Sequence, residues 1–119
     1  MKKVLIADGL PGGRELLRIL LEHEGYEVIE AADWTKALAM ARATLPDLIL
    51  VDLEQDGDGY RAVQEMRLDE LLKDRPILAV TDRSRQADRE HLVEAGFSGY
   101  IAKPVVLRTL REQLTQLWI

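Results

Sequence analysis

The chain alternates between short apolar runs and longer amphipathic segments, and this alternation constrains its fold more than any other feature. Rich in Val and Ile, the runs have the length of strands buried on both faces: 4–7, 27–31, 47–52, 76–81 and 99–102. Between them, apolar residues recur at helical spacing, as do Leu107, Leu110, Leu114 and Leu117 in the last segment. Strands that each precede a helix predict right-handed crossovers and a parallel sheet, within one α/β domain over residues 1–119.

Composition excludes several classes of protein. The chain has no cysteine, which removes disulfide and thiolate chemistry. No apolar run approaches the roughly 20 residues that a bilayer span needs, and the N-terminus does not resemble a signal peptide. A formal net charge of −5 argues against a general nucleic-acid-binding surface. We therefore expect a cytoplasmic protein that has no membrane partner and no direct nucleic-acid partner.

Polar side chains follow four of the predicted strands at the point where each strand ends. Asp8 follows the first, Asp52 the third, Thr81 with Asp82 the fourth and Lys103 the fifth. Taken singly, each has an ordinary explanation as a cap, a turn residue or a solvated side chain. The carboxyl ends of parallel strands meet at one edge of the sheet, where α/β proteins place their ligands. Together these residues predict a site at that edge.

Four segments, in this order and at this spacing, give the chain a resemblance over nearly its whole length. They read VLIADGLPGGRELLRILLEHEGYEVIEAADWTKAL, PDLILVDLEQDGDGY, RPILAVTD and EAGFSGYIAKP. The chain resembles the response-regulator receiver domains of two-component signalling. The resemblance implies a flavodoxin-like (βα)5 fold, a doubly wound parallel sheet of five strands in the order 2-1-3-4-5.

The resemblance also implies a phosphoryl-transfer site. Asp52 matches the phosphoryl acceptor, which attacks the phosphohistidine of a sensor histidine kinase or phosphotransfer protein. Mg²⁺ is then expected beside it, held by Asp8, Asp52 and the main-chain carbonyl of Glu54. Such domains are binding and signalling modules, so we do not expect an enzyme in the usual sense.

Three further positions match the switch of this family. Lys103 matches the lysine that pairs with the acceptor, and its bond to Pro104 is expected to be cis. Thr81 matches the hydroxyl that binds the phosphoryl group, and Tyr100 matches the aromatic residue that moves inward with it. This movement shifts the surface of the fourth helix, fifth strand and fifth helix toward an output protein or domain. A homodimer through the last helix stays open.

The chain departs from the family pattern inside the expected site. Gly9 stands where a second acid usually supplies a direct metal ligand, so we expect a weakened Mg²⁺ site. Asp82 replaces a small residue, and it either repels the phosphoryl group, turns outward or serves as a metal ligand. The acidic loop after Asp52 lacks a usual proline and is one residue shorter.

Two more positions stand out beside these departures. Glu54 and Arg83 occupy places that tune the lifetime of the phosphoryl group in this family. Because their charges are opposite, we expect them to pair across the pocket mouth and to restrict attacking water. Trp34 replaces a frequent glycine, and we interpret it as a surface or partly packed aromatic residue outside the site.

Other functions remain as alternatives to a phosphorylated receiver. Gly9 and Asp82 favour a pseudo-receiver, which keeps the fold and signals by protein binding alone. A haloacid-dehalogenase-type enzyme needs a second Asp two residues after the first, where this chain has Glu54. The loop from Glu54 to Glu65 matches the letters of a calcium-binding EF-hand, but a strand precedes it where an EF-hand has a helix.

Overall fold

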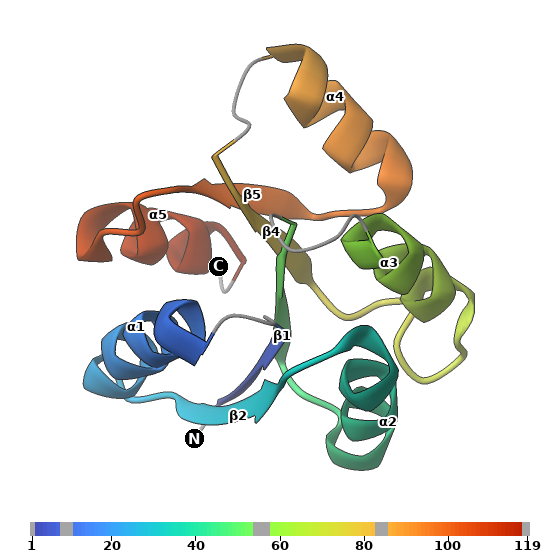
Figure 1. The fold of residues 1–119 in the computed structure, drawn as a ribbon, viewed down its shortest axis with the longest axis horizontal. Helices are drawn as coiled ribbons and strands as arrows, with labels where there is room; N and C mark the ends of the chain where they lie inside the picture. The colour runs from blue at the N-terminus through green and yellow to red at the C-terminus, as the bar shows by residue number, and fades with distance from the viewer. Residues whose placement is uncertain (1, 8–10, 54–57, 83–85, 118–119) are drawn as a thin grey trace.

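The computed structural model describes residues 2–7, 11–53, 58–82 and 86–117. Strands and helices alternate throughout, as Figure 1 shows. Their bounds are β1 Lys3–Ala7, α1 Pro11–His23, β2 Glu27–Ala31, α2 Trp34–Thr44, β3 Leu48–Asp52, α3 Asp58–Leu68, β4 Ile77–Thr81, α4 Gln86–Ala95, β5 Gly99–Ala102 and α5 Leu107–Leu117. All four strand pairings are parallel, and the order is β2-β1-β3-β4-β5. The predicted flavodoxin-like topology is confirmed.

The sheet separates two apolar cores. Helices α1 and α5 cover one face, and α2, α3 and α4 cover the other (Figure 1). Successive side chains of a strand point to opposite faces, so Leu48 and Leu50 join the α1/α5 core while Ile49 and Val51 join the α2/α3/α4 core. All five residues of β3 are buried. A strand covered on both sides needs a continuous apolar run, which is why the sequence pattern placed β3 correctly.

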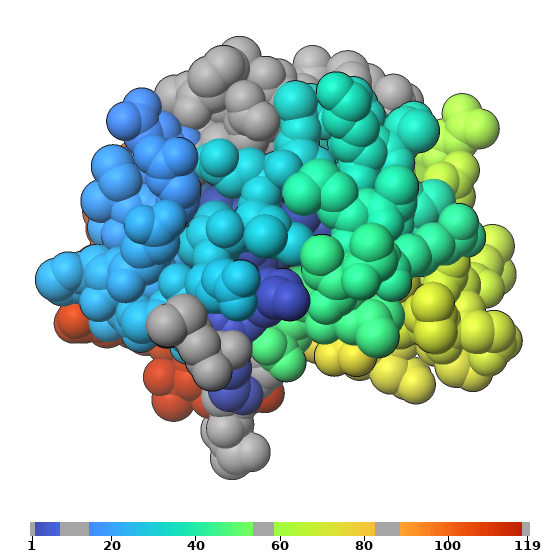
Figure 2. All heavy atoms as spheres, turned by 90° about the horizontal axis from the view of Figure 1, so that it is seen from below, coloured from blue at the N-terminus to red at the C-terminus, as the bar shows by residue number. Residues whose placement is uncertain are grey.

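The edge strand β2 has a different character. Figure 2 shows this edge, with α1 on the left and α2 on the right of the strand. Of its residues, only Ala31 is fully buried. Arg18 of α1 reaches the strand with its guanidinium Nη1 3.6 Å from a carboxylate oxygen of Glu30. The half-exposed edge accounts for charged residues within a strand of otherwise apolar composition.

Helix ends follow local backbone chemistry. Gly25 has φ +90° and Gly96 has φ +115°, a region that glycine adopts without strain, and each lies just beyond a helix. At the end of α2 the same role falls to Leu45, whose φ is 48° and whose N–H donates to Ala41 O at 2.9 Å. This left-handed leucine comes directly before Pro46.

Among the described residues, no helix is both long and apolar enough to cross a membrane. Leu110 and Leu114 of α5, two of the leucines at helical spacing in the sequence, are buried in the α1/α5 core.

Candidate functional site

Asp52 and Lys103 meet at the carboxyl edge of the sheet. Asp52 is the last residue of β3, and Lys103 follows the last residue of β5. The Lys103 Nζ lies 2.8 Å from Asp52 Oδ2, and the carboxylate side chain is only 3% exposed. The peptide bond from Lys103 to Pro104 is cis, as expected. A nearly buried carboxylate held by an ammonium group is thus the centre of the described site.

Thr81 lies between these two groups in the sheet. It ends β4, the strand between β3 and β5, and is fully buried. In the strand register Asp52 is opposite Val80, and Thr81 is opposite Ala102. The Lys103 N–H donates to the Thr81 carbonyl oxygen at 2.9 Å, which fixes the backbone of the lysine to that of the threonine. The structure therefore brings three of the predicted residues onto adjacent strand ends.

Tyr100 lies further back along β5, in a half-buried position. Its ring packs against the α2/α3/α4 core. The Cζ atom of Arg89, from α4, lies 5.8 Å from the ring centroid, within reach of a cation–π interaction. No pattern in the sequence indicated this contact.

The remaining predicted residues divide into one that the structure describes and several that it does not. Asp82 follows Thr81 and is exposed, so its carboxylate lies at the surface of the site and not beneath it. Asp8, Gly9, Glu54 and Arg83 lie outside the described residues. Their roles, including the Glu54–Arg83 pair, stay predictions.

The described residues on either side of the acidic loop do not have the arrangement of a calcium-binding EF-hand. A strand, β3, precedes it, and α3 begins at Asp58, which the calcium template places at its fifth position. Gly59 and Glu65 are therefore part of a helix. An EF-hand needs an incoming helix and an open loop over these positions, so the structure excludes it.

Two packing contacts beside the site had no clear signal in the sequence. The Cζ2 atom of Trp34 lies 3.6 Å from the point that a Cβ atom on Gly59 would occupy, next to the acceptor loop. Tyr60, the next residue of α3, lies with its ring centroid 4.8 Å from that of His91 on α4. Both contacts join elements distant in sequence, and single-residue patterns do not encode such pairings.

The oxygen chemistry of the site fits Mg²⁺, although only one of the predicted ligands is described. Mg²⁺ prefers carboxylate, carbonyl and water oxygens, and Asp52 supplies a carboxylate at the sheet edge. Within 2–7, 11–53, 58–82 and 86–117, no three His, Asp or Glu side chains gather closely enough to hold a metal. The described part of the chain thus supplies a ligand, not a complete metal cage.

Comparison with known proteins agrees with this geometry. Residues 4–115 match the family described as the response regulator receiver domain. The polar-differentiation response regulator DivK of Brucella ovis is 34% identical over 105 residues, which cover 87% of this chain and 85% of that protein.

Solved structures give the same result. The Vibrio cholerae chemotaxis protein CheY4 superposes with a TM-score of 0.91 at 30% identity, covering 98% of each chain. The receiver domain of the Pseudomonas aeruginosa sensor histidine kinase PA1611, with magnesium in its active-site cleft, gives 0.87 at 32%, covering 98% of this chain and 96% of that one. By sequence, fold and the arrangement of its strand ends, this chain belongs to the response regulator receiver domain family of two-component signal transduction.

Proposed function

We propose that the chain receives a phosphoryl group on Asp52. The observation that carries this proposal is the ion pair between the nearly buried Asp52 carboxylate and Lys103, beside the buried Thr81. A buried carboxylate is costly unless a partner compensates it, and here the partner is an ammonium at the open edge of the sheet. Receiver domains are signalling modules, and accepting a phosphoryl group is typical of them.

The reaction is a displacement at phosphorus. A carboxylate oxygen of Asp52 attacks the phosphorus of a phosphohistidine, so that an O–P bond forms and the P–N bond breaks. The electron pair of the broken bond stays on the imidazole of the partner, which takes up a proton. The product is an aspartyl phosphate, and the partner is a histidine kinase or a phosphotransfer protein.

Lys103 and Thr81 supply stabilisation around the new group. The Lys103 ammonium neutralises the carboxylate before transfer and afterwards binds a phosphoryl oxygen. The Thr81 hydroxyl binds a second phosphoryl oxygen. Its movement toward the phosphate makes room for Tyr100 to turn inward, and the face of α4, β5 and α5 then changes its fit to an output protein or domain.

Mg²⁺ supplies charge neutralisation at the phosphoryl oxygens when it is bound. Receiver domains bind this ion in their active sites. Here Asp52, Asp8 and the carbonyl of Glu54 are the proposed ligands. Gly9 removes a carboxylate that the family usually provides, so we propose a weaker Mg²⁺ site than in receivers with two acids there.

The comparisons do not favour the alternative of a pseudo-receiver that signals by binding alone. We further propose that residues 1–119 act as one receiver unit, that they bind no nucleic acid directly, and that the kinase and output partner are proteins. A homodimer through the last helix stays open in this proposal.

The proposal is tested by incubating the protein with acetyl phosphate and Mg²⁺ and separating the products on a phosphate-affinity gel. We expect a retarded band with the wild type and none with Asp52→Ala. Lack of any Asp52-dependent band, in a sample whose circular dichroism shows a folded protein, would show that the chain does not use phosphorylation.

A further inference from the structure

Trp34 is the first residue of α2, and its backbone is held by a well-formed helix start. The Asp33 carboxylate accepts a hydrogen bond from the Lys36 N–H at 2.8 Å, and the Ala37 N–H donates to Asp33 O at 2.9 Å. The indole is half-buried and packs against the α2/α3/α4 core. Its ring therefore has a defined place at the junction of α2 and α3.

Leu53 and Gly59 flank the loop that follows the acceptor. A Cβ atom on Gly59 would lie 2.5 Å from Leu53 Cδ2 and 3.2 Å from Val51 Cγ1, so the glycine backbone rests directly on these side chains. The same point lies 3.6 Å from Trp34 Cζ2. We call Trp34, Leu53 and Gly59 the loop clasp, because the residues on either side of the loop lie together there and an edge atom of the indole lies beside Gly59.

The loop clasp is joined to the acceptor by one peptide unit. Leu53 follows Asp52 directly, and its N–H donates to Val80 O at 3.1 Å, which continues the pairing of β3 with β4. A shift of Leu53 would therefore move the Asp52 carboxylate relative to Thr81, which follows Val80. Phosphoryl transfer depends on such distances, and a displacement of about 1 Å can cost up to about a hundredfold in rate.

We propose that Trp34 is a positioning residue for phosphoryl transfer to Asp52, acting through Gly59 and Leu53. This inference rests on the proposed function of Asp52 and adds a residue that lies on a different helix. In this chain the acceptor loop has lost a proline that stiffens it in the family pattern, and the indole of Trp34 restrains the flanks of that loop instead. The residue that looked like a packed surface aromatic thus has a part in the site.

Trp34 can also serve as a fluorescent reporter of changes at the site. Between α2 and α3 lies a hollow of about 270 Å³, lined by Trp34, Thr35, Leu38, Arg61, Ala62 and Glu65. The indole lines this hollow and also lies beside Gly59, so its surroundings change if Gly59 moves. The chain has two tryptophans, and Trp118→Phe leaves Trp34 as the single fluorophore.

The first experiment compares rates of phosphorylation by acetyl phosphate with Mg²⁺. We expect Trp34→Ala to react roughly tenfold more slowly than the wild type, and Trp34→Phe to stay within about threefold. Leu38→Ala is the matched control, because Leu38 lies one turn along α2 and packs on the same core, while none of the three heavy atoms nearest to the Cβ point of Gly59 belongs to it. It should lose thermal stability but keep the wild-type rate.

The second experiment needs no variant of Trp34. In Trp118→Phe protein, beryllium fluoride with Mg²⁺ should change the emission of Trp34 in a saturable way, and Asp52→Ala should abolish the change. Equal rates for Trp34→Ala and Leu38→Ala, or constant emission with a phosphorylated wild type, would overturn the role of Trp34. If the wild type itself shows no Asp52-dependent phosphorylation, the proposed function fails instead.

Discussion

At the scale of single residues, the ion pair of Asp52 and Lys103 dominates the site. Its oxygen and nitrogen atoms are 2.8 Å apart, and the lysine is more exposed than the aspartate. The ammonium thus lies on the open side, where a phosphoryl group would arrive. An ammonium group stabilises a neighbouring negative charge more strongly in a partly buried site than it would in water.

Removal of this ammonium should slow phosphoryl transfer without changing the fold. We expect Lys103→Met to reduce the rate of phosphorylation by acetyl phosphate about a hundredfold, the usual cost of losing one preorganised charge-stabilising group. Lys103→Arg keeps the charge but changes the reach, so it should recover only part of the rate.

Lys73→Met is the control for this change. Lys73 also has a carboxylate partner, Glu70, at 3.2 Å, but it lies in the turn after α3 and outside the site. The Lys73→Met protein should be phosphorylated at the same rate as the wild type. A Lys103→Met protein that is phosphorylated as fast as Lys73→Met would show that the ion pair has only a structural part.

Residue patterns in the sequence indicated this pair but not its surroundings. Asp52 is the last residue of one apolar run and Lys103 directly follows another, and the sequence alone shows both positions. The approach of Trp34 to Gly59 depends on how α2 and α3 pack, and the contact of Arg89 with Tyr100 depends on how α4 packs on β5. Because such contacts follow from three-dimensional packing, the sequence left both residues looking like ordinary surface positions.

At the scale of elements, Arg67 joins three segments on the side opposite the acceptor loop. From α3, its Nε donates to Gly96 O at 2.8 Å, its Nη1 to Lys73 O at 2.9 Å and Arg75 O at 2.6 Å, and its Nη2 to Ser98 Oγ at 3.1 Å. A planar guanidinium with several donors suits this arrangement of acceptors. It joins the residues that follow α4 to the turn after α3.

Burial lowers the pKa of the Arg67 guanidinium, and the nearby Asp74 acts in the opposite direction. A guanidinium keeps its charge at neutral pH all the same. Its hydrogen bonds are therefore charge-assisted, which makes each of them stronger than a bond between neutral groups.

Replacement of Arg67 should destabilise the whole domain. We expect Arg67→Met to lower the free energy of unfolding by about 2 kcal/mol, since it leaves part-buried carbonyl oxygens without their donor. Arg67→Lys should recover little, because one ammonium cannot reach all the acceptors. Urea unfolding followed by circular dichroism measures both.

Arg61→Met is the matched control on the same helix. The Arg61 side chain is 80% exposed, and its ion pair with Glu65 is 3.4 Å long. Such a pair contributes little, so the free energy of unfolding should change by less than about 0.5 kcal/mol. Equal losses from Arg61→Met and Arg67→Met would refute the role given to Arg67.

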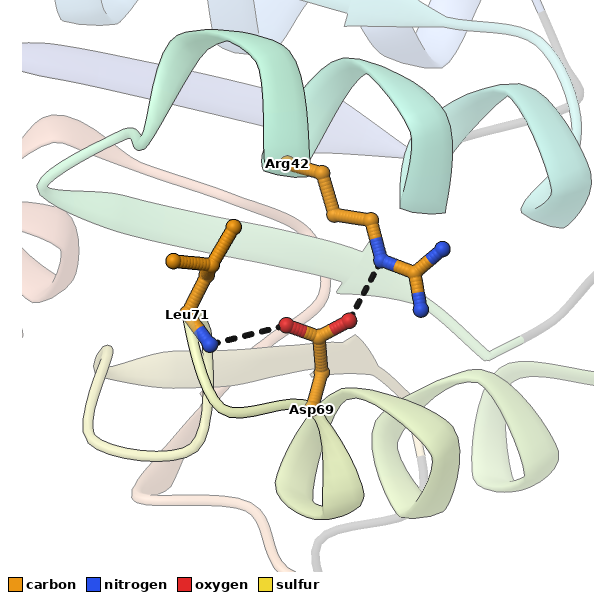
Figure 3. A network of polar contacts seen from close by, with 3 residues as sticks. All are labelled: Arg42, Asp69 and Leu71. Atoms are coloured by element: carbon orange, nitrogen blue, oxygen red, sulfur yellow. Dashed lines mark hydrogen bonds and ion pairs between the residues drawn. The ribbon is translucent and has the colours of Figure 1, made fainter.

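A second link between elements joins α2 to the turn after α3. Figure 3 shows the Asp69 carboxylate between Arg42 of α2 and the Leu71 backbone, whose N–H donates to Asp69 Oδ1 at 2.9 Å. The hydrogen bond and ion pair with Arg42 are the main cause that lowers the pKa of Asp69 below its ordinary value, and the bond from Leu71 adds to it.

This lowered pKa predicts a stabilising contribution that depends on pH. The folded state holds the charged carboxylate, so the contribution is complete above the ordinary carboxyl pKa of about 4 and is lost as pH falls through the lower folded value. Asp69→Asn should therefore be less stable than the wild type at pH 7, and the difference in unfolding midpoint should shrink in acid. A difference that stays constant down to the acid limit would contradict this account.

At the scale of the whole molecule, the fold was predictable because its signal is repeated along the chain. The central strands β1, β3 and β4 are buried apolar runs, and the helices between the strands have apolar residues at helical spacing, so the order of elements emerges even where single boundaries differ by a residue. The strand order came from the resemblance, because apolar periodicity does not encode which strands are neighbours. The segment after Asp52 shows what residue types alone cannot predict. Its residues match a calcium-binding pattern, but α3 begins within that pattern.

At this scale, the fold connects the Asp52 site with the proposed partner surface. The sheet brings Asp52, Thr81 and Lys103 together from three strands, and α3 and α4 connect that edge to the proposed partner surface through Tyr60 and His91. The Asp52 site is in this way connected to the elements of the proposed partner surface.

The most direct test of this account locates the phosphoryl group itself. After treatment with acetyl phosphate and Mg²⁺, borohydride reduces an aspartyl phosphate to homoserine, and peptide mass spectrometry identifies the converted residue. The account predicts conversion at Asp52 and at no other aspartate, and none without the phosphoryl donor. An unconverted Asp52, or conversion at Asp8 or Asp82 in its place, would contradict it.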